Sequence, residues 1–519
     1  MTVLWLRDKP IRRYAVALLV GILFSTALVA SSQGAQGTFF PVGPGWSDVI
    51  PRQIVRTFDD HVYIFAGEKQ DVESLVAYRT TSPGFPGAGG FEGIAEVETN
   101  GAPISVDAAY NGGTIIHVLV NTNAGQLLDY PFDLVTNTFR SPLILVSNTP
   151  TIAGYYIGTS GVSAMVDRSG LLHVAYWTSG NHIVHRAYTY NSASNTLVAS
   201  GDPFQVDTAG RANHPAIAIS PFDNSLTVAW VSEATEPPRI LARTRSSNGV
   251  WGDVQTVSTA PVWTSVNNGI SIDQGPSLLI GWDGTRHLTY IEDFDDSGHY
   301  GRVHYVENKG SGWVDTELNI YSHAPALAIN SANELYIIGH GPVQNGSNHN
   351  MYTMKRNTNG SWGAPQLFAT PPGHDTFDAS PSVKWSLVGF NRADVIEFVF
   401  FKGEEEDYFD TTLYYGRLAA PTSLTITPQA TATPSSTPLP PSLTAHVTLT
   451  PTVTNTPLPP PPTFIFQPTF TPPPMFTPIS SPLPTNTPVT SEAPEVTDTP
   501  YLLPTATATV TPAPLPPPF

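Results

Sequence analysis

Short apolar runs of four to six residues recur along most of the chain, separated by Gly, Asn, Asp, Pro and Ser. Four such runs, rich in Val, Ile, Trp and Thr, lie within His214–Val257. Runs of this length and composition, bounded by turn-forming residues, predict β-strands. Four strands in roughly 45 residues correspond to one blade of a β-propeller.

The same pattern predicts seven blades between residues 38 and 418. Each has an aliphatic first strand, a tight turn, a second strand and then a third. Six first strands are expected to open on proline, which loses no essential ladder hydrogen bond there; these prolines are Pro51, Pro103, Pro215, Pro276, Pro325 and Pro381. Six blades have a fourth strand, and three of those strands begin near a tryptophan, namely Trp251, Trp313 and Trp362.

The seventh blade has no fourth strand before the composition changes after Arg417. The segment Trp46–Val49 parallels Trp251–Val254, because both read Trp, a small residue, Asp and Val. We therefore predict that residues 39–50 form the outer strand of blade seven. An N-terminal strand that pairs with the last blade closes the ring and leaves few exposed strand edges. The expected fold is an all-β, seven-bladed β-propeller closed by an N-terminal outer strand.

The two ends of the chain differ from this core. Residues 1–32 combine four basic residues, an apolar run over Ala15–Ala30 and small residues after it, which predicts a signal peptide. If the peptide stays uncleaved, it is the only expected membrane contact, although the run is short for a span of about 20 residues. Residues 419–519 are rich in Thr and Pro and predict a disordered, extended tail. We expect a secreted or cell-surface protein.

The net charge and the cysteine content exclude several classes of chemistry and of binding partner. The 519 residues include no cysteine, which excludes disulfides, thiolate catalysis and cysteine-bound zinc. The net charge of -18 argues against nucleic acid and anionic membrane surfaces as partners. We expect a monomer.

Residues 165–176 read Met-Val-Asp-Arg-Ser-Gly-Leu-Leu-His-Val-Ala-Tyr. This pattern of strand, Asp-x-x-Gly turn and strand resembles the sialidase-like (BNR-type) β-propeller superfamily. The resemblance covers residues 38–418 as a repeat, and the intact Asp-box of true sialidases, Ser-x-Asp-x-Gly-x-x-Trp, is absent. An exported propeller with a Thr/Pro-rich tail also resembles surface proteins of filamentous bacteria.

Four second strands carry a histidine at the matching position, and these are His61, His117, His173 and His287. A catalytic histidine would be needed once, on one loop. A residue that returns blade after blade is more simply a packing or hydrogen-bonding element. We therefore predict a structural role for all four.

In a propeller, the loops that enter the first strands lie on the same side as the loops that join strands two and three. That side is rich in acidic residues and also holds Arg211, His214, Glu233 and His323. Arg52 lies near the first arginine of the resembled superfamily, although its Ile-Pro-Arg order does not meet the Phe-Arg-Ile-Pro motif. The candidate binding residues are Arg52, Arg211, His214, Glu233, Tyr290 and His323.

The loop after Glu292 is a candidate calcium site. Asp293, Asp295 and Ser297 place oxygens at positions 1, 3 and 5, and a glycine follows at position 6. Gly301 and His304 occupy the positions where a later carboxylate is required. A solvated acidic loop is the competing interpretation, and it is favoured. No other cofactor is expected.

We therefore expect an exported, non-catalytic propeller that binds a glycan or an extracellular protein on its acidic rim. The alternative is a glycan-active enzyme, either a sialidase-like hydrolase or a polysaccharide lyase with His214, Tyr290 and Arg211 in the roles of base, acid and neutraliser. The enzyme requires Arg52, Arg211, His214 and Tyr290, or another set with arginines, to converge over the central channel. The fold alone does not name the ligand.

Overall fold

The computed structural model describes residues 37–43, 52–67, 73–86, 90–110, 112–149, 161–262, 275–292, 301–322, 325–330, 333–341, 350–367, 395–404 and 407–419. All of these belong to the first of two compact units, Met1–Gln429. Within these ranges every regular element is a β-strand, and no helix there could cross a membrane. The predicted signal peptide and nearly all of the predicted tail lie outside them and stay predictions.

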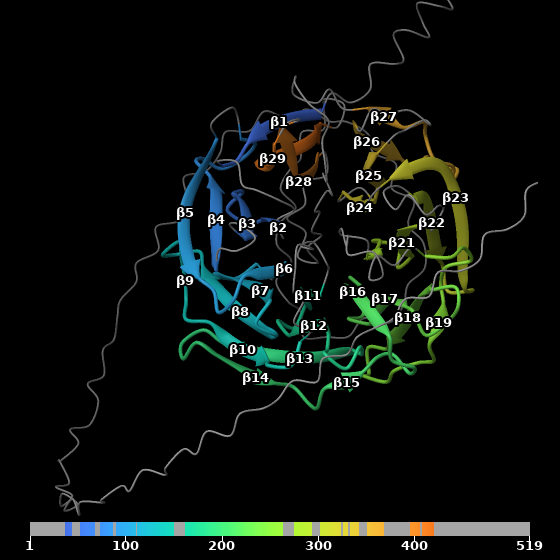
Figure 1. The fold of residues 1–519 in the computed structure, drawn as a ribbon, viewed down its shortest axis with the longest axis horizontal. Coiled ribbons are helices and arrows are strands. Elements are labelled where there is room, and N and C mark those ends of the chain that lie inside the picture. The colour runs from blue at the N-terminus through green and yellow to red at the C-terminus, as the bar shows by residue number, and fades with distance from the viewer. Residues whose placement is uncertain are drawn as a thin grey trace, which may run out of the picture. The chain divides into compact units, whose positions relative to one another are not determined.

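The described strands form seven antiparallel sheets arranged as a ring (Figure 1). Blade one contains β2 (Arg52–Arg56), β3 (Val62–Gly67), β4 (Ser74–Thr80) and β5 (Phe91–Glu98). Blade two contains β6 (Pro103–Tyr110), β7 (Ile115–Thr122), β8 (Gln126–Asp133), β9 (Thr138–Phe139) and β10 (Leu143–Val146). Blade three contains β11 (Val162–Val166), β12 (Leu172–Trp177), β13 (Ile183–Asn191), β14 (Thr196–Ala199) and β15 (Phe204–Gln205).

The second half of the ring repeats this order. Blade four contains β16 (Ala212–Ile219), β17 (Leu226–Ser232), β18 (Arg239–Arg245) and β19 (Gln255–Thr256). Blade five contains β20 (Ser277–Ile280), β21 (Arg286–Ile291), β22 (Gly301–Asn308) and β23 (Trp313–Ser322). Blade six contains β24 (Ala326–Ile329), β25 (Leu335–Gly341), β26 (Asn350–Lys355) and β27 (Gln366–Leu367). Blade seven contains β28 (Val395–Glu404), β29 (Asp407–Ala419) and β1 (Gly37–Pro41). The seven blades confirm the predicted fold class.

The cores of the protein lie between blades. Phe65 of blade one packs with Val118 of blade two, and Ile64 of blade one packs with Val399 of blade seven. The inner strands are therefore covered on both faces; every residue of β6, β7, β16 and β17 is buried. Outer strands such as β23 mix exposed positions with intermediate and buried ones. Apolar side chains of a blade are thus buried against both of its neighbours, as blade one shows.

Polar side chains also tie adjacent inner strands together. Asp107 of β6 accepts a hydrogen bond from Gln53 Nε2 of β2 (2.8 Å) and another from the backbone N of Ala164 in β11 (2.7 Å). Ser163 Oγ accepts from the backbone N of Ile217 in β16 (3.2 Å), which continues the series into blade four. These bonds set the position of one blade relative to the next.

The structure describes four of the six predicted prolines, and three of them follow the prediction, whereas Pro51 lies outside the described residues. Pro103 opens β6, while Pro276 and Pro325 stand directly before β20 and β24. Pro215 lies inside β16, so the prediction that it opens the strand was wrong by three residues. The register between β16 and β17 shifts between Asn213 and Ala216, which is a β-bulge. A proline is tolerated there because the bulge leaves its position outside the hydrogen-bonded ladder.

An N-terminal strand closes the ring, as predicted. Strand β1 pairs antiparallel with β29, from Gly37 opposite Leu418 to Pro41 opposite Tyr414. The strand lies upstream of Trp46–Val49, the segment whose similarity predicted it, and that segment lies outside the described residues. Pro381 and the first strand expected after it lie outside them as well.

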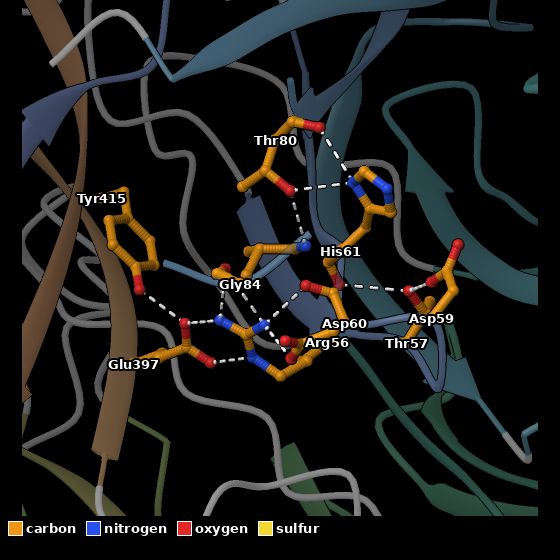
Figure 2. Close-up of polar contacts among 10 residues, drawn as sticks. Arg56, Thr57, Asp59, Asp60, His61, Thr80, Gly84, Glu397 and Tyr415 are labelled. Carbon is orange, nitrogen blue, oxygen red and sulfur yellow. Dashed lines mark hydrogen bonds and ion pairs between the residues drawn. The ribbon is translucent and has the colours of Figure 1, made fainter. Parts of the chain in front are cut away.

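A buried ion pair makes a second connection between blades one and seven (Figure 2). Arg56 of β2 donates through Nε to Glu397 Oε2 of β28 at 2.6 Å, and its Nη2 pairs with Oε1. Arg56 is 3% exposed and Glu397 11%. The Tyr415 hydroxyl donates to the same carboxylate, and burial raises the pKa of Tyr415 well above its usual value. The hydroxyl therefore keeps its proton and helps to hold Glu397.

Replacing Glu397 with Gln should destabilise the propeller by about 3 kcal/mol, because it leaves the Arg56 cation buried with Asp60 as its one remaining close anion among the described residues. The matched control is Glu92→Gln, which breaks the pair Arg79–Glu92 on the outer part of blade one, where Glu92 is 45% exposed. This control should change stability by less than about 1 kcal/mol. Urea unfolding at neutral pH measures both, and equal effects would contradict the proposed role of Glu397 in ring closure.

Candidate functional site

The start of blade four brings together three of the predicted binding residues. Arg211 directly precedes β16, His214 lies within it, and Glu233 directly follows β17. Arg211 Nη2 is 3.7 Å from Glu233 Oε2, and Asn213 Nδ2 donates to Glu233 Oε1 at 2.9 Å. The backbone N of Glu233 donates to the Arg211 carbonyl at 2.8 Å. The two strands therefore hold a charged pair at one end of the blade.

The backbone at this place is strained. Arg211 has a φ angle of 51° and His214 a φ angle of 50°, both in the left-handed region that residues with a side chain rarely adopt. Each such residue costs on the order of 1–3 kcal/mol, and such strain is concentrated at binding sites. A hydrogen bond from Ala212 N to the Asn181 carbonyl (3.0 Å) ties the segment to blade three. The strain therefore marks this segment as a functional candidate.

Three buried polar atoms near the strained segment have no hydrogen-bond partner among the described residues. They are Asn213 Oδ1, His214 Nδ1 and Nε1 of Trp177, the last residue of β12 in blade three. The Trp177 and His214 rings lie 6.4 Å apart between centroids. An unsatisfied buried polar atom costs about 1–3 kcal/mol, so most in native proteins are completed by water or a ligand. Together they offer an acceptor, a donor and an imidazole nitrogen.

Polar groups of blade three extend the site. His182 Nδ1 is 3.0 Å from Asp207 Oδ2, which also accepts from Gly210 N at 2.9 Å. The side chains of His182 and Arg211 are 37% and 66% exposed, so they can reach a ligand from solvent. We define the blade-four rim as Trp177, His182, Asp207, Arg211, Asn213, His214 and Glu233. Trp177, His182, Asp207 and Asn213 are additions that the candidate list from the sequence did not contain.

Burial determines the ionisation state of His214. Burial lowers the pKa of His214 to about 4, so its imidazole is neutral at physiological pH. A neutral imidazole can donate from one nitrogen and accept at the other. The rim at neutral pH thus presents an Arg–Glu pair, a neutral histidine and an indole.

The set of residues that the enzyme alternative requires is not assembled at this rim. Tyr290 is buried in β21, where its hydroxyl donates to Asp315 Oδ2 of β23 at 2.5 Å and accepts from Ala260 N at 3.3 Å. Its phenol is therefore directed toward the outermost strand of blade five, whereas His214 lies beside blade three. Arg52 is 4% exposed and opens β2 in blade one. His323, Asp293, Asp295 and Ser297 lie outside the described residues and stay predictions.

The repeated histidines are bonded inside their own blades, which confirms their predicted structural role. In each case Nδ1 contacts a group on the third strand. The partners are Thr80 for His61, Asp129 for His117 (2.7 Å), His185 for His173 (3.1 Å) and the Tyr305 hydroxyl for His287 (2.6 Å). His173 also contacts Asp167 of the Asp-x-x-Gly turn through Nε2 at 3.3 Å.

Blade five contains two groups of candidate metal ligands. The predicted calcium ligands lie outside the described residues. Within the described ranges, Glu292, His304 and Glu317 place one ligand atom each within 4.8 Å of one another.

No family model and no curated protein matches this sequence. Among solved structures, the BP39L lectin from Burkholderia pseudomallei is 11% identical, with 72% of this chain and 97% of the lectin covered and a TM-score of 0.52. The SapL1 lectin, solved with alpha methyl fucoside, is 12% identical over 63% of this chain and 99% of its own, with a TM-score of 0.37. The phage phi92 endosialidase is 11% identical, with 77% of this chain and 72% of the endosialidase covered and a TM-score of 0.37. At such identity the likeness to BP39L shows the fold alone.

We expect the buried His185 to make the protein less stable in mild acid. Burial lowers the pKa of His185 to about 3, far below the unfolded value of about 6.5. Its contribution is therefore complete above pH 6.5 and is lost as the pH falls toward 3. On going from pH 7 to pH 5, the wild-type protein should lose about 2 kcal/mol more of its unfolding free energy than the His185→Gln variant. Urea unfolding at the two pH values measures this, and equal losses would show that His185 is not held neutral.

Proposed function

We propose that this protein is an exported, non-catalytic propeller that binds a glycan at the blade-four rim. The observation that carries the proposal is a group of buried polar atoms on Asn213, His214 and Trp177 that have no hydrogen-bond partner in the described part of the chain and lie beside the Arg211–Glu233 pair. Residues 1–32 support export through their basic start and apolar run. The propeller fold adds an architecture that the BP39L lectin shares.

The chemistry of the rim suits a sugar. A sugar ring has an apolar face of C–H groups and an edge of hydroxyls that both donate and accept. Small-ligand sites combine aromatic surface with a few placed polar groups, and Trp177 with Asn213 and His214 has this composition. Arg211 and Glu233 add charge-assisted hydrogen bonds, which are roughly twice as strong as neutral ones.

The charge of the rim favours a neutral sugar over an acidic one. Arg211 already has Glu233 as its anionic partner at 3.7 Å. Asp207 adds a further carboxylate nearby, and the chain as a whole carries a net charge of -18. An acidic glycan would be repelled over long range, whereas sugar hydroxyls can bond to carboxylates and to the guanidinium group alike.

Replacing Trp177 with Ala should weaken binding of the recognised glycan at least about tenfold, since it removes both an aromatic face and a donor. Arg211→Ala should also weaken it, and this change is safe for folding because Arg211 is 66% exposed. Phe222→Ala is the control, because Phe222 is 58% exposed in the turn at the other end of blade four. A glycan array finds the ligand and titration calorimetry compares the variants.

Three results would overturn the assignment. Unchanged affinity in both rim variants would place the glycan elsewhere on the propeller. The absence of any glycan bound by the wild-type protein would leave an extracellular protein as the partner. Product release on the array would instead support the enzyme alternative.

A further inference from the structure

A second group of side chains lies in blade five and takes no part in the blade-four rim. His304 of β22 stands directly opposite Glu317 of β23 in the strand register. Glu292 directly follows β21, where its backbone N donates to the Arg302 carbonyl at 2.8 Å. The three side chains come from three neighbouring strand positions and bring one ligand atom each within 4.8 Å of one another.

His304 is held in a defined orientation. Its side chain is 6% exposed, and Nδ1 lies 2.9 Å from Asp315 Oδ1. An ionised carboxylate can only accept, so Nδ1 carries the hydrogen and Nε2 is directed to the other side of the ring. Asp315 is itself fixed by hydrogen bonds from the Thr259 backbone N (2.7 Å) and the Tyr290 hydroxyl (2.5 Å).

The opposite nitrogen, Nε2 of His304, is buried and has no hydrogen-bond partner among the described residues, and the same holds for Glu292 Oε2. The two atoms lie 3.5 Å apart, which is an ion-pair distance when His304 is protonated. At that separation the two atoms are too far apart for a good hydrogen bond but can share a cation between them. A buried imidazole nitrogen and a buried carboxylate oxygen that face each other without bonding are an arrangement that a metal ion would complete.

We propose that Glu292, His304 and Glu317 bind a divalent transition-metal ion, with zinc as the ion that suits them best. Zinc takes imidazole nitrogen and carboxylate oxygen together and is often held by three protein ligands with a fourth position open. Calcium and magnesium prefer oxygen ligands alone, so the histidine argues against them. The Asp315–His304 hydrogen bond is the carboxylate–histidine arrangement that orients imidazole ligands in zinc proteins.

The local charge supports a cation. Glu292 and Glu317 supply two negative charges, and Asp315 supplies a third behind the imidazole. The nearby cation Arg302 engages Glu317 Oε1 at 2.9 Å on the partly exposed side of the cluster. A carboxylate has two oxygens, so Glu317 can keep this contact and offer the other oxygen to a metal. The competing arrangement is a protonated His304 bridging Asp315 and Glu292, in which a proton takes the place of the metal.

The proposal is independent of the proposed glycan site, because no residue is shared between the two. The full-length protein, prepared without a histidine tag and treated with a chelator, should be titrated with Zn²⁺ by calorimetry at pH 7.5. We expect one zinc ion per chain. Ca²⁺ added in excess should not displace it.

Glu317→Gln should weaken zinc binding at least about tenfold. It should leave the fold intact, because this side chain is 45% exposed. Glu92→Gln is the matched control, because Glu92 is also a 45%-exposed carboxylate on an outer strand paired with an arginine. Its zinc affinity should equal that of the wild-type protein. Co²⁺ gives a second readout, since its visible absorption bands should be present in the wild-type protein and reduced in Glu317→Gln.

Three outcomes would overturn the proposal. They are no zinc binding by the wild-type protein, which would support the protonated His304 bridge; binding of Ca²⁺ in preference to Zn²⁺; and equal zinc affinity in the wild-type protein and Glu317→Gln. Loss of glycan binding has no bearing on any of these measurements, so the two proposals can fail separately.

Discussion

The junction between blade seven and blade one is the constraint on which the whole ring depends. The described core clusters are shared between neighbouring blades, so an opened ring would expose apolar faces of both blades at the break and a free strand edge. Among the described residues, two unlike polar interactions close it, in addition to apolar contacts such as that of Ile64 with Val399. The β1–β29 ladder supplies backbone hydrogen bonds, and the Arg56–Glu397 pair joins side chains 341 residues apart. The ion pair also favours this arrangement of the two blades, because separating them would leave each buried charge without its partner.

Closure also explains how the blade-four rim can hold strained residues. The left-handed angles of Arg211 and His214 would relax in an isolated hairpin. In the ring, blade four is fixed on the blade-three side by the Ser163–Ile217 bond, and Arg211 is held by Glu233. The packing of the whole propeller therefore offsets the free-energy cost of these left-handed angles. The strained conformation places polar atoms of blades three and four side by side.

The repeat made the fold predictable from the sequence, and departures from the repeat set the limits of the prediction. Strands, turns and the blade count follow from patterns that occur seven times. The closing strand was found through the likeness of Trp46 to Trp251, yet Trp251 forms only an isolated bridge with Arg245 and β19 begins at Gln255. The likeness therefore marked the right part of the chain without marking the strand itself. Pro215 was misplaced for a related reason, since a bulge leaves no periodic signal.

The blade-five cluster was missed because linear spacing and strand register bring different residues together. In the linear sequence, His304 occupies a position where a calcium loop needs a carboxylate. The residue therefore argued against a calcium site. Counted across strands, the same histidine faces Glu317 and approaches Glu292. The four repeated histidines bond within their blades, whereas His304 and His214 belong to no such series and keep a nitrogen without a partner among the described residues. In a propeller, a polar residue that occurs once and is left unsatisfied is therefore a stronger sign of chemistry than one that recurs.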